Sequence, residues 1–122
     1  MTVSYHEPAS ELSTQTREIH RAIATLVEEL EAVDWYQQRV DVTGDEELKA
    51  ILAHNRDEEI EHAVMALEWL RRQLAKFDEQ LRVYLFTSDP ITQIEDAADQ
   101  GSIQAGSQSG LGGDLGVGSL QR

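Results

Sequence analysis

The segment His54–His62, which reads HNRDEEIEH, decides the fold of this 122-residue chain. Within it, Glu59 and His62 are three residues apart, so a helix would present both side chains on one face, about one turn from each other. A carboxylate and an imidazole at that spacing can hold a metal ion between them. A Glu-x-x-His pair alone is a weak signal, because acidic helices also produce it by chance.

The pair belongs to a stripe in which residues recur at alternating spacings of three and four, a pattern typical of a buried helix seam. The stripe consists of Leu48, Leu52, Asn55, Glu59, His62, Ala66 and Trp69. Two ionisable residues therefore stand where the pattern favours aliphatic side chains. Because burying an unpaired carboxylate costs several kcal/mol, we expect a partner, and a cation is the natural one. A hydrogen-bonded pair that fixes the register of a dimer is the alternative.

Composition restricts the class of protein. The hydrophobic content of 40% suffices for one small domain. The chain has no cysteine, which fits a cytoplasmic location and leaves oxygen and imidazole ligands, favouring iron, manganese or zinc. The net charge of −13 argues against a nucleic-acid partner. The sequence shows neither an apolar run long enough for a membrane span nor a signal peptide, so no membrane association is expected.

A long helix is predicted from about Ser10, with Ser10 or Ser13 as its N-cap, since no Gly or Pro occurs between residues 10 and 43. Its apolar face comprises Leu12, Thr16, Ile19, Ile23, Leu26, Leu30, Val33 and Val40. Glu29 borders this face, and Tyr36, seven residues later, lies on the same side. At ~1.5 Å per residue the helix would be ~45 Å long.

The break at 41–45 separates this helix from a second one, predicted from about Asp45 to Lys76. Thr43 and Glu46 have the spacing of a capping box for that second helix. So short a connection predicts an antiparallel two-helix hairpin, and hence an all-α fold. Beyond the hairpin, Asp78 is predicted to cap a brief helical turn through Leu85. Asp89 and Pro90 are predicted to start a last short helix, Ile91 to Ala98.

After the hairpin domain, residues 1–98, the composition changes. Every glycine except Gly44 falls within residues 101–122. Residues 99–113 are therefore interpreted as a flexible, disordered linker. Residues 114–122 contain the cluster Leu115-Gly-Val-Gly-Ser-Leu120, whose spaced aliphatic side chains suit an extended peptide that binds pockets on a partner. A frayed terminus with chance aliphatics is the simpler alternative.

The count of ligands indicates a symmetric dimer. Ferritin-like dimetal sites use one Glu from each of two helices and a Glu-x-x-His from each of two others. This chain offers Glu29 on the first helix and Glu59 with His62 on the second, which is half of such a site on half of a four-helix bundle. Twofold symmetry, the commonest symmetry of oligomers, supplies the other half.

Several segments resemble the encapsulated ferritins. These are Glu28–Tyr36 (EELEAVDWY), His54–His62, Leu67–Arg72 and Tyr84–Thr87 (YLFT), across roughly residues 6 to 94. The terminal Leu115–Leu120 resembles that family's cargo-loading peptide for encapsulin shells, with Val117 where Ile is frequent. The resemblance implies a two-helix protomer, dimers that carry a site for two Fe ions, and a decameric ring of five dimers.

The resemblance also implies roles for individual residues. Glu29, Glu59 and His62 would be the ferroxidase ligands, with Trp35 and Tyr36 beside the site. Glu28 and Glu31 would line the path of metal access, and His54, Glu58 and Glu61 an outer metal site. The simpler readings are a solvated acidic face for these glutamates, a surface residue for His54, and interface anchors for Trp35 and Tyr36.

The resulting hypothesis is an iron oxidase held as cargo inside an encapsulin nanocompartment. Two Fe(II) ions would sit between two chains, and O₂ would accept their electrons. Because the half-site of one chain encloses no storage cavity, iron storage would depend on the shell. The alternatives are another dimetal enzyme, such as a manganese catalase or an oxygenase, and a helical dimerisation module without catalysis.

Overall fold

The first long helix, α1 (Thr14–Val42), begins directly after a capping serine. Oγ of Ser13 accepts a hydrogen bond of 3.0 Å from the backbone N–H of Thr16, which confirms one of the two predicted N-caps. A short 3-10 turn, η1 (Ala9–Glu11), precedes it. Arg17 fastens this turn to α1 by donating from Nη2 to the carbonyl oxygen of Ala9 at 2.6 Å.

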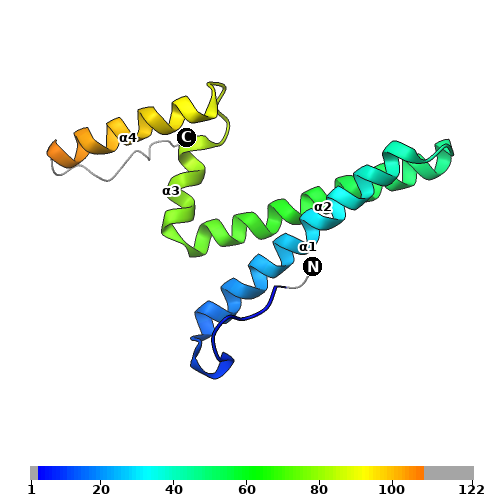
Figure 1. Ribbon diagram of the computed structural model, residues 1–122, viewed down its shortest axis with the longest axis horizontal. Helices are drawn as coiled ribbons and strands as arrows, with labels where there is room; N and C mark the ends of the chain where they lie inside the picture. The colour runs from blue at the N-terminus through cyan, green and yellow to red at the C-terminus, as the bar shows by residue number, and fades with distance from the viewer. Residues whose placement is uncertain (1–2, 109–122) are drawn as a thin grey trace. The chain divides into compact units, whose positions relative to one another are not determined.

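The second long helix, α2 (Glu46–Gln73), runs back along α1, so the predicted antiparallel hairpin is confirmed (Figure 1). Gln15, near the start of α1, donates a side-chain hydrogen bond of 3.2 Å to Gln73 at the end of α2. Closer to the connection, Nη1 of Arg56 donates to the side-chain oxygen of Gln37 at 2.7 Å. These two hydrogen bonds join α1 to α2 at two separate points along the hairpin.

The N-cap of α2 differs from the prediction. Oδ1 of Asp45 accepts the backbone N–H of Leu48 at 2.8 Å, so Asp45 is the cap. The predicted capping box of Thr43 and Glu46 is wrong, because Oγ1 of Thr43 accepts instead from the backbone N–H of Asp45, at 3.3 Å. The aspartate stands one residue before the helix, where its short carboxylate reaches the exposed N–H groups of the first turn.

The computed structural model describes residues 3–108, and in that range its elements are η1, α1, α2, α3 (Ala75–Tyr84) and α4 (Ile91–Gln108), which confirms the all-α prediction. The chain forms two units, Met1–Gln73 and Leu74–Arg122. None of the helices in the described range is sufficiently long and apolar to span a membrane.

The second unit departs from the predicted boundaries. Leu74, with extended backbone angles, separates α2 from α3, so α2 does not reach Lys76. Asp78 does not cap a turn but lies within α3, where its carboxylate accepts from Nε of Arg82 at 3.0 Å. The carbonyl oxygen of Pro90 accepts hydrogen bonds from the backbone N–H groups of Gln93 and Ile94, the first in α4. Pro90 therefore takes the N-cap position that was predicted for Asp89.

The prediction that the last helix ends at Ala98 is wrong, since α4 continues to Gln108. Gly101 lies inside it, and beyond its chain neighbours and the adjacent helix backbone no described atom stands within 4 Å of where its Cβ would be. A glycine in an exposed helix interior costs about 1 kcal/mol relative to Ala, which weakens a helix without ending it. The rest of the predicted linker, and the predicted peptide 114–122, lie outside the described residues.

Candidate metal centre

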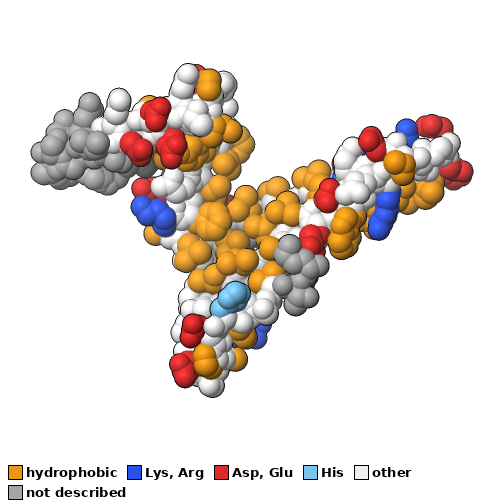
Figure 2. Space-filling view, viewed as in Figure 1, with side chains coloured by type: hydrophobic (Ala, Val, Ile, Leu, Met, Phe, Trp, Pro, Cys, Tyr) orange, Lys and Arg blue, Asp and Glu red, His pale blue; other side chains and the backbone are white. Residues whose placement is uncertain are grey.

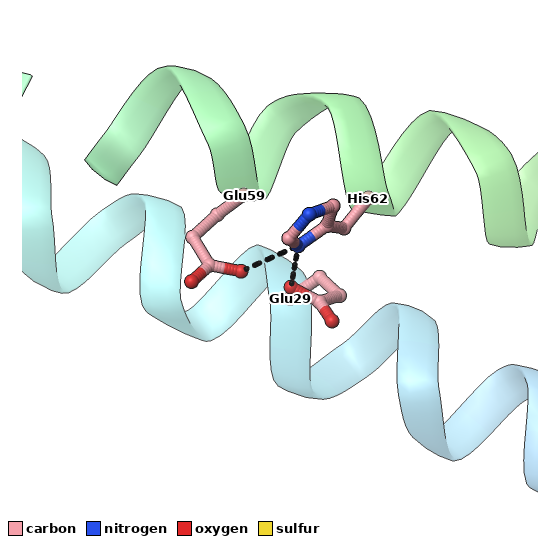
Figure 3. A group of neighbouring side chains, drawn as sticks. All are labelled: Glu29, Glu59 and His62. Atoms are coloured by element: carbon pink, nitrogen blue, oxygen red, sulfur yellow. Dashed lines mark ion pairs between the residues drawn. The ribbon is translucent and has the colours of Figure 1, made fainter. Parts of the chain in front are cut away.

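Three side chains from the two long helices converge at one point of the hairpin. Glu29 reaches it from α1, and Glu59 and His62 reach it from α2, as Figure 3 shows. Nδ1 of His62 lies 3.5 Å from Oε1 of Glu29 and 3.4 Å from Oε1 of Glu59. One potential ligand atom from each residue lies within 4.8 Å of the others. The structure thus brings together the three predicted ligands.

The distances suit a metal ion. Ligand atoms that share one ion at ~2.1 Å lie up to ~4.2 Å apart, so small side-chain rotations bring these three onto one ion. Two carboxylates and an imidazole form a donor set for iron, manganese or zinc. Within residues 3–108 no other cluster of three His, Asp or Glu side chains meets the same distance criterion.

The proximity of Glu29, Glu59 and His62 shifts the pKa values of Glu29 and His62. The neighbouring Glu59 carboxyl and partial burial raise the pKa of Glu29, and the nearby His62 only partly opposes this. Desolvation alone would lower the pKa of His62, but the bond to Glu59 and the charges of Glu29 and Glu59 outweigh it and raise that pKa. Two carboxylates crowded around one imidazole therefore favour a bound cation, whether a proton or a metal ion.

The site lies at the surface of the hairpin. The exposed fraction of the side chain is 46% for His62, 23% for Glu29 and 24% for Glu59. The stripe predicted as a buried seam is likewise open, since Leu48 and Trp69 are exposed. The α2 residues that are buried in the single chain, Ala63 and Leu70, belong to the adjacent face.

An exposed apolar stripe beside the three potential ligands is the principal feature of this face. Figure 2 shows hydrophobic side chains exposed over the hairpin. The exposed large apolar residues of the two long helices are Ile23, Leu30, Trp35, Val42, Leu48, Ile51, Ile60, Val64, Met65 and Trp69. A surface so rich in apolar side chains is typical of an interface with another protein molecule.

The remaining predicted site residues lie on the same two helices. Trp35 is half exposed on α1, and Tyr36 is partly buried. Glu28 is exposed and Glu31 partly buried on α1, whereas His54, Glu58 and Glu61 are exposed on α2. These five acidic and imidazole groups form no three-ligand cluster within the described part of one chain. Their roles in metal access and in an outer site stay predictions.

Two neighbouring residues went unnoticed in the sequence. Cζ of Arg39 lies 5.2 Å from the ring centroid of Tyr36, close enough for a cation–π contact. Arg56, one turn before Glu59, ties α2 to Gln37. The contact between Arg39 and Tyr36 could have been predicted, because residues three apart on one helix lie on the same face. The bond between Arg56 and Gln37 could not, because it depends on the register of α1 against α2, and spacing within one helix carries no information about that register.

Known proteins resemble this chain over nearly its whole length. A model of the family described as EncFtn-like matches residues 4–88. The "Encapsulated ferritin-like protein" of Rhodospirillum rubrum is 57% identical over 124 residues, which cover 97% of this chain and 88% of that protein. The "Ferritin-like protein" of Thermotoga maritima is 54% identical, with coverages of 96% and 97%.

Two further similarities extend the comparison. The "Encapsulin nanocompartment cargo protein EncC" of Myxococcus xanthus is 34% identical and covers 99% of this chain and 98% of its own length. A crystal structure of a protein from Nitrosomonas europaea superposes with a TM-score of 0.71 at 64% sequence identity, covering 72% of this chain and 97% of that one.

Proposed function

Because the chain belongs to the EncFtn-like family of encapsulated ferritins, we propose that it is a ferroxidase which oxidises Fe(II) to Fe(III) with O₂ at a di-iron site between two subunits. The observation that carries the proposal is the convergence of Glu29, Glu59 and His62 on one exposed point. A second copy related by a twofold axis doubles this set to four carboxylates and two imidazoles, the ligand number of ferritin-like dimetal sites.

The apolar stripe supports the same geometry. Leu48 and Trp69 flank the ligands along α2 and are exposed in the single chain. Packing two hairpins along this stripe would complete a four-helix bundle, bury these side chains and enclose the ligands. Each large aliphatic or aromatic side chain that becomes buried contributes on the order of 1.5–3 kcal/mol.

The ligands suit the reaction. Glu29 and Glu59 supply negative charge, which stabilises the more highly charged Fe(III) product, while His62 supplies a neutral donor that also suits Fe(II). One electron leaves each Fe(II), so a pair of ions supplies the two electrons that, with two protons, reduce O₂ to hydrogen peroxide. A second pair is required to reach water.

The charge of the protein assists delivery of the substrate ions. A net charge of −13 raises the local concentration of cations. We assign Glu28 and Glu31 to the path of metal access, and His54, Glu58 and Glu61 to an outer site that gathers Fe(II). Trp35 and Tyr36 would flank the centre, where their rings limit solvent access.

The storage of the oxidised iron is assigned to an encapsulin shell. Two of its relatives are named as an encapsulated ferritin-like protein and an encapsulin nanocompartment cargo protein. By similarity, Leu115, Val117 and Leu120 would anchor the chain to the shell, and the protein would work inside the nanocompartment as a decamer of five dimers.

Iron-dependent O₂ consumption by purified variants tests the proposal. We expect Glu29→Ala, Glu59→Ala and His62→Ala each to fall to the rate of iron in buffer, because a twofold site loses each ligand twice. Glu47→Ala, which removes an exposed carboxylate at the start of α2, is the matched control and should keep the parent rate. If all three ligand variants oxidise iron as fast as the parent, the centre lies elsewhere.

The same assay separates the alternative functions. A manganese catalase would release O₂ from hydrogen peroxide and show no consumption of O₂ with Fe(II). A dimerisation module without catalysis would show neither reaction, although it would still associate.

A further inference from the structure

Beside the metal centre lies a polar side chain that the proposed function does not use, the carboxamide of Asn55. Asn55 stands on α2 four residues before Glu59, in the stripe of alternating spacings that also contains Glu59 and His62. Side chains four residues apart on a helix are neighbours, with Cβ atoms about 5–6 Å apart. The carboxamide of Asn55 is therefore within reach of the Glu59 carboxylate.

The position of Asn55 in the stripe favours an apolar side chain. Leu48 and Leu52 come before it at the same alternating spacing. Asn55 is partly buried in the single chain, and none of the hydrogen bonds among the described residues involves its carboxamide. When another chain covers this face, an amide without a partner loses its contact with water, which is unfavourable. Asn55 thus needs a hydrogen-bond partner at the centre itself.

Glu59 offers such a partner, because one of its carboxylate oxygens has still to be oriented. Its Oε1 lies 3.4 Å from Nδ1 of His62, and carboxylates that bind metal ions are themselves held in place by hydrogen bonds. The side chains nearest to Glu59 by spacing on α2 are those of Asn55, Arg56, His62 and Ala63. His62 is itself a potential ligand and Ala63 has no polar group, so Asn55 and Arg56 are the possible donors on α2.

The guanidinium of Arg56 is directed elsewhere. Its Nη1 donates to the side-chain oxygen of Gln37 at 2.7 Å, and its Nε donates to Oδ1 of Asp57 at 3.1 Å. A guanidinium beside the ligands would also repel an incoming metal cation, whereas a carboxamide donates without a net charge. Asn55 is therefore the neutral donor that α2 offers to Glu59.

We propose that Asn55 is a positioning residue, whose Nδ2 donates a hydrogen bond to Oε2 of Glu59 and holds that carboxylate in its metal-binding orientation. The inference rests on the proposed function, since it requires a metal ion between the ligands. On α1 the equivalent position is not available to Glu29, because the hydroxyl of Thr25 donates to the carbonyl of Arg21 at 2.8 Å. The bond from Asn55 thus distinguishes the α2 carboxylate from the α1 carboxylate.

Calorimetric titration of the full chain with Zn(II) tests this role through the metal alone. Asn55→Leu keeps a side chain of similar size without the donor, so the affinity for Zn(II) should fall about 10- to 100-fold. Asn55→Gln should keep most of the affinity, since a longer amide still pairs with an acid four residues later. Gln38→Leu, which removes an exposed amide bonded to Asp34, is the matched control and should bind as the parent does. Parent affinity in Asn55→Leu, or an equal loss in Asn55→Gln, overturns the proposal.

Sedimentation velocity in the presence of a chelator separates positioning from packing. An apolar side chain in an apolar seam favours association, so Asn55→Leu should associate at least as strongly as the parent although it binds metal more weakly. A residue that acts only in packing would shift association and metal affinity in the same direction, because metal binds the assembled state. Weaker association of Asn55→Leu in the chelator contradicts the proposal.

The hydrogen bond itself can be observed by NMR. Asn55 is the only asparagine of the chain, so selective labelling of asparagine with nitrogen-15 gives the signals of one side-chain amide. On saturation with Zn(II), the proton donated to Glu59 should shift downfield relative to the second proton of the amide. Unchanged signals at saturation contradict the bond.

His62→Ala in the same calorimetric series separates this inference from the proposed function. Weak Zn(II) binding by His62→Ala together with parent affinity in Asn55→Leu would overturn the role of Asn55 and leave the metal centre in place. Parent affinity in His62→Ala would instead overturn the centre, and with it this inference.

Discussion

Oε1 of Glu29 on α1 lies 3.5 Å from Nδ1 of His62 on α2, across the two helices of the hairpin. The approach depends on the register of the hairpin, in which Gln15 is hydrogen-bonded to Gln73 and Arg56 to Gln37. The three potential ligands are therefore already close together in the single folded chain.

Metal should promote association of the chains. Each copy brings half of the ligands, so an ion that binds the assembled state alone stabilises that state by mass action. Native mass measurement with and without Fe(II) under anaerobic conditions should show a shift to larger species. Glu59→Ala should lose this shift. Association that is indifferent to metal would count against a shared site.

Binding of metal should release protons. The pKa of His62 is raised above its ordinary value, so below that raised pKa both ring nitrogens are protonated and an incoming ion must displace one of the two protons. The affinity should fall as the pH is lowered through the raised pKa and level off above it. Calorimetric titration with Zn(II) in two buffers of different ionisation enthalpy measures the protons released, and equal heats in both would contradict the prediction.

Asp45→Ala should destabilise the hairpin by about 1 kcal/mol, within the range of ~0.5–2 kcal/mol for loss of an N-cap. The carboxylate accepts the backbone N–H of Leu48 at 2.8 Å. Thr43→Ala removes only the longer bond to the N–H of Asp45 and should cost less. Urea unfolding of the metal-free chain at one fixed concentration compares the two, and an equal or larger cost for Thr43→Ala would reverse the assignment of the cap.

Deletion of residues 114–122 should abolish co-purification with a co-expressed encapsulin shell protein and leave Fe(II) oxidation unchanged. The separation follows from the position of the three ligands within residues 29–62. Many tails on one assembled ring would bind the shell with high avidity even if each binds weakly. Continued encapsulation of the truncated chain would show that the tail is no tether, and loss of oxidation would show that it belongs to the catalytic unit.

Periodicity predicted the hairpin and the placement of Glu59 and His62 on one face of α2, because both depend on local spacing. Glu59 and His62 share a turn, and the lack of Gly and Pro between residues 10 and 43 leaves one long helix. The connection at 43–45 was located correctly, but its cap was not. Asp45 and Thr43 both have side chains that can cap a helix, and only the backbone angles of the connection select between them.

Other features could not be predicted from spacing. The stripe that contains Glu59 and His62 has the spacing of a buried seam, yet Leu48 and Trp69 are exposed in the single chain. Periodicity reports that a face is apolar and does not report which molecule covers it. The length of α4 was underestimated because Gly101 was treated as a boundary, although an isolated glycine only weakens a helix.

The most direct test of the central claim is a crystal structure of the protein soaked with Fe(II) in the absence of O₂, with iron located by anomalous scattering. We expect two iron ions on either side of a twofold axis, held by Glu29, Glu59 and His62 of both chains. Iron held by the three residues of one chain alone, or bound only at other positions, would contradict a centre shared between subunits.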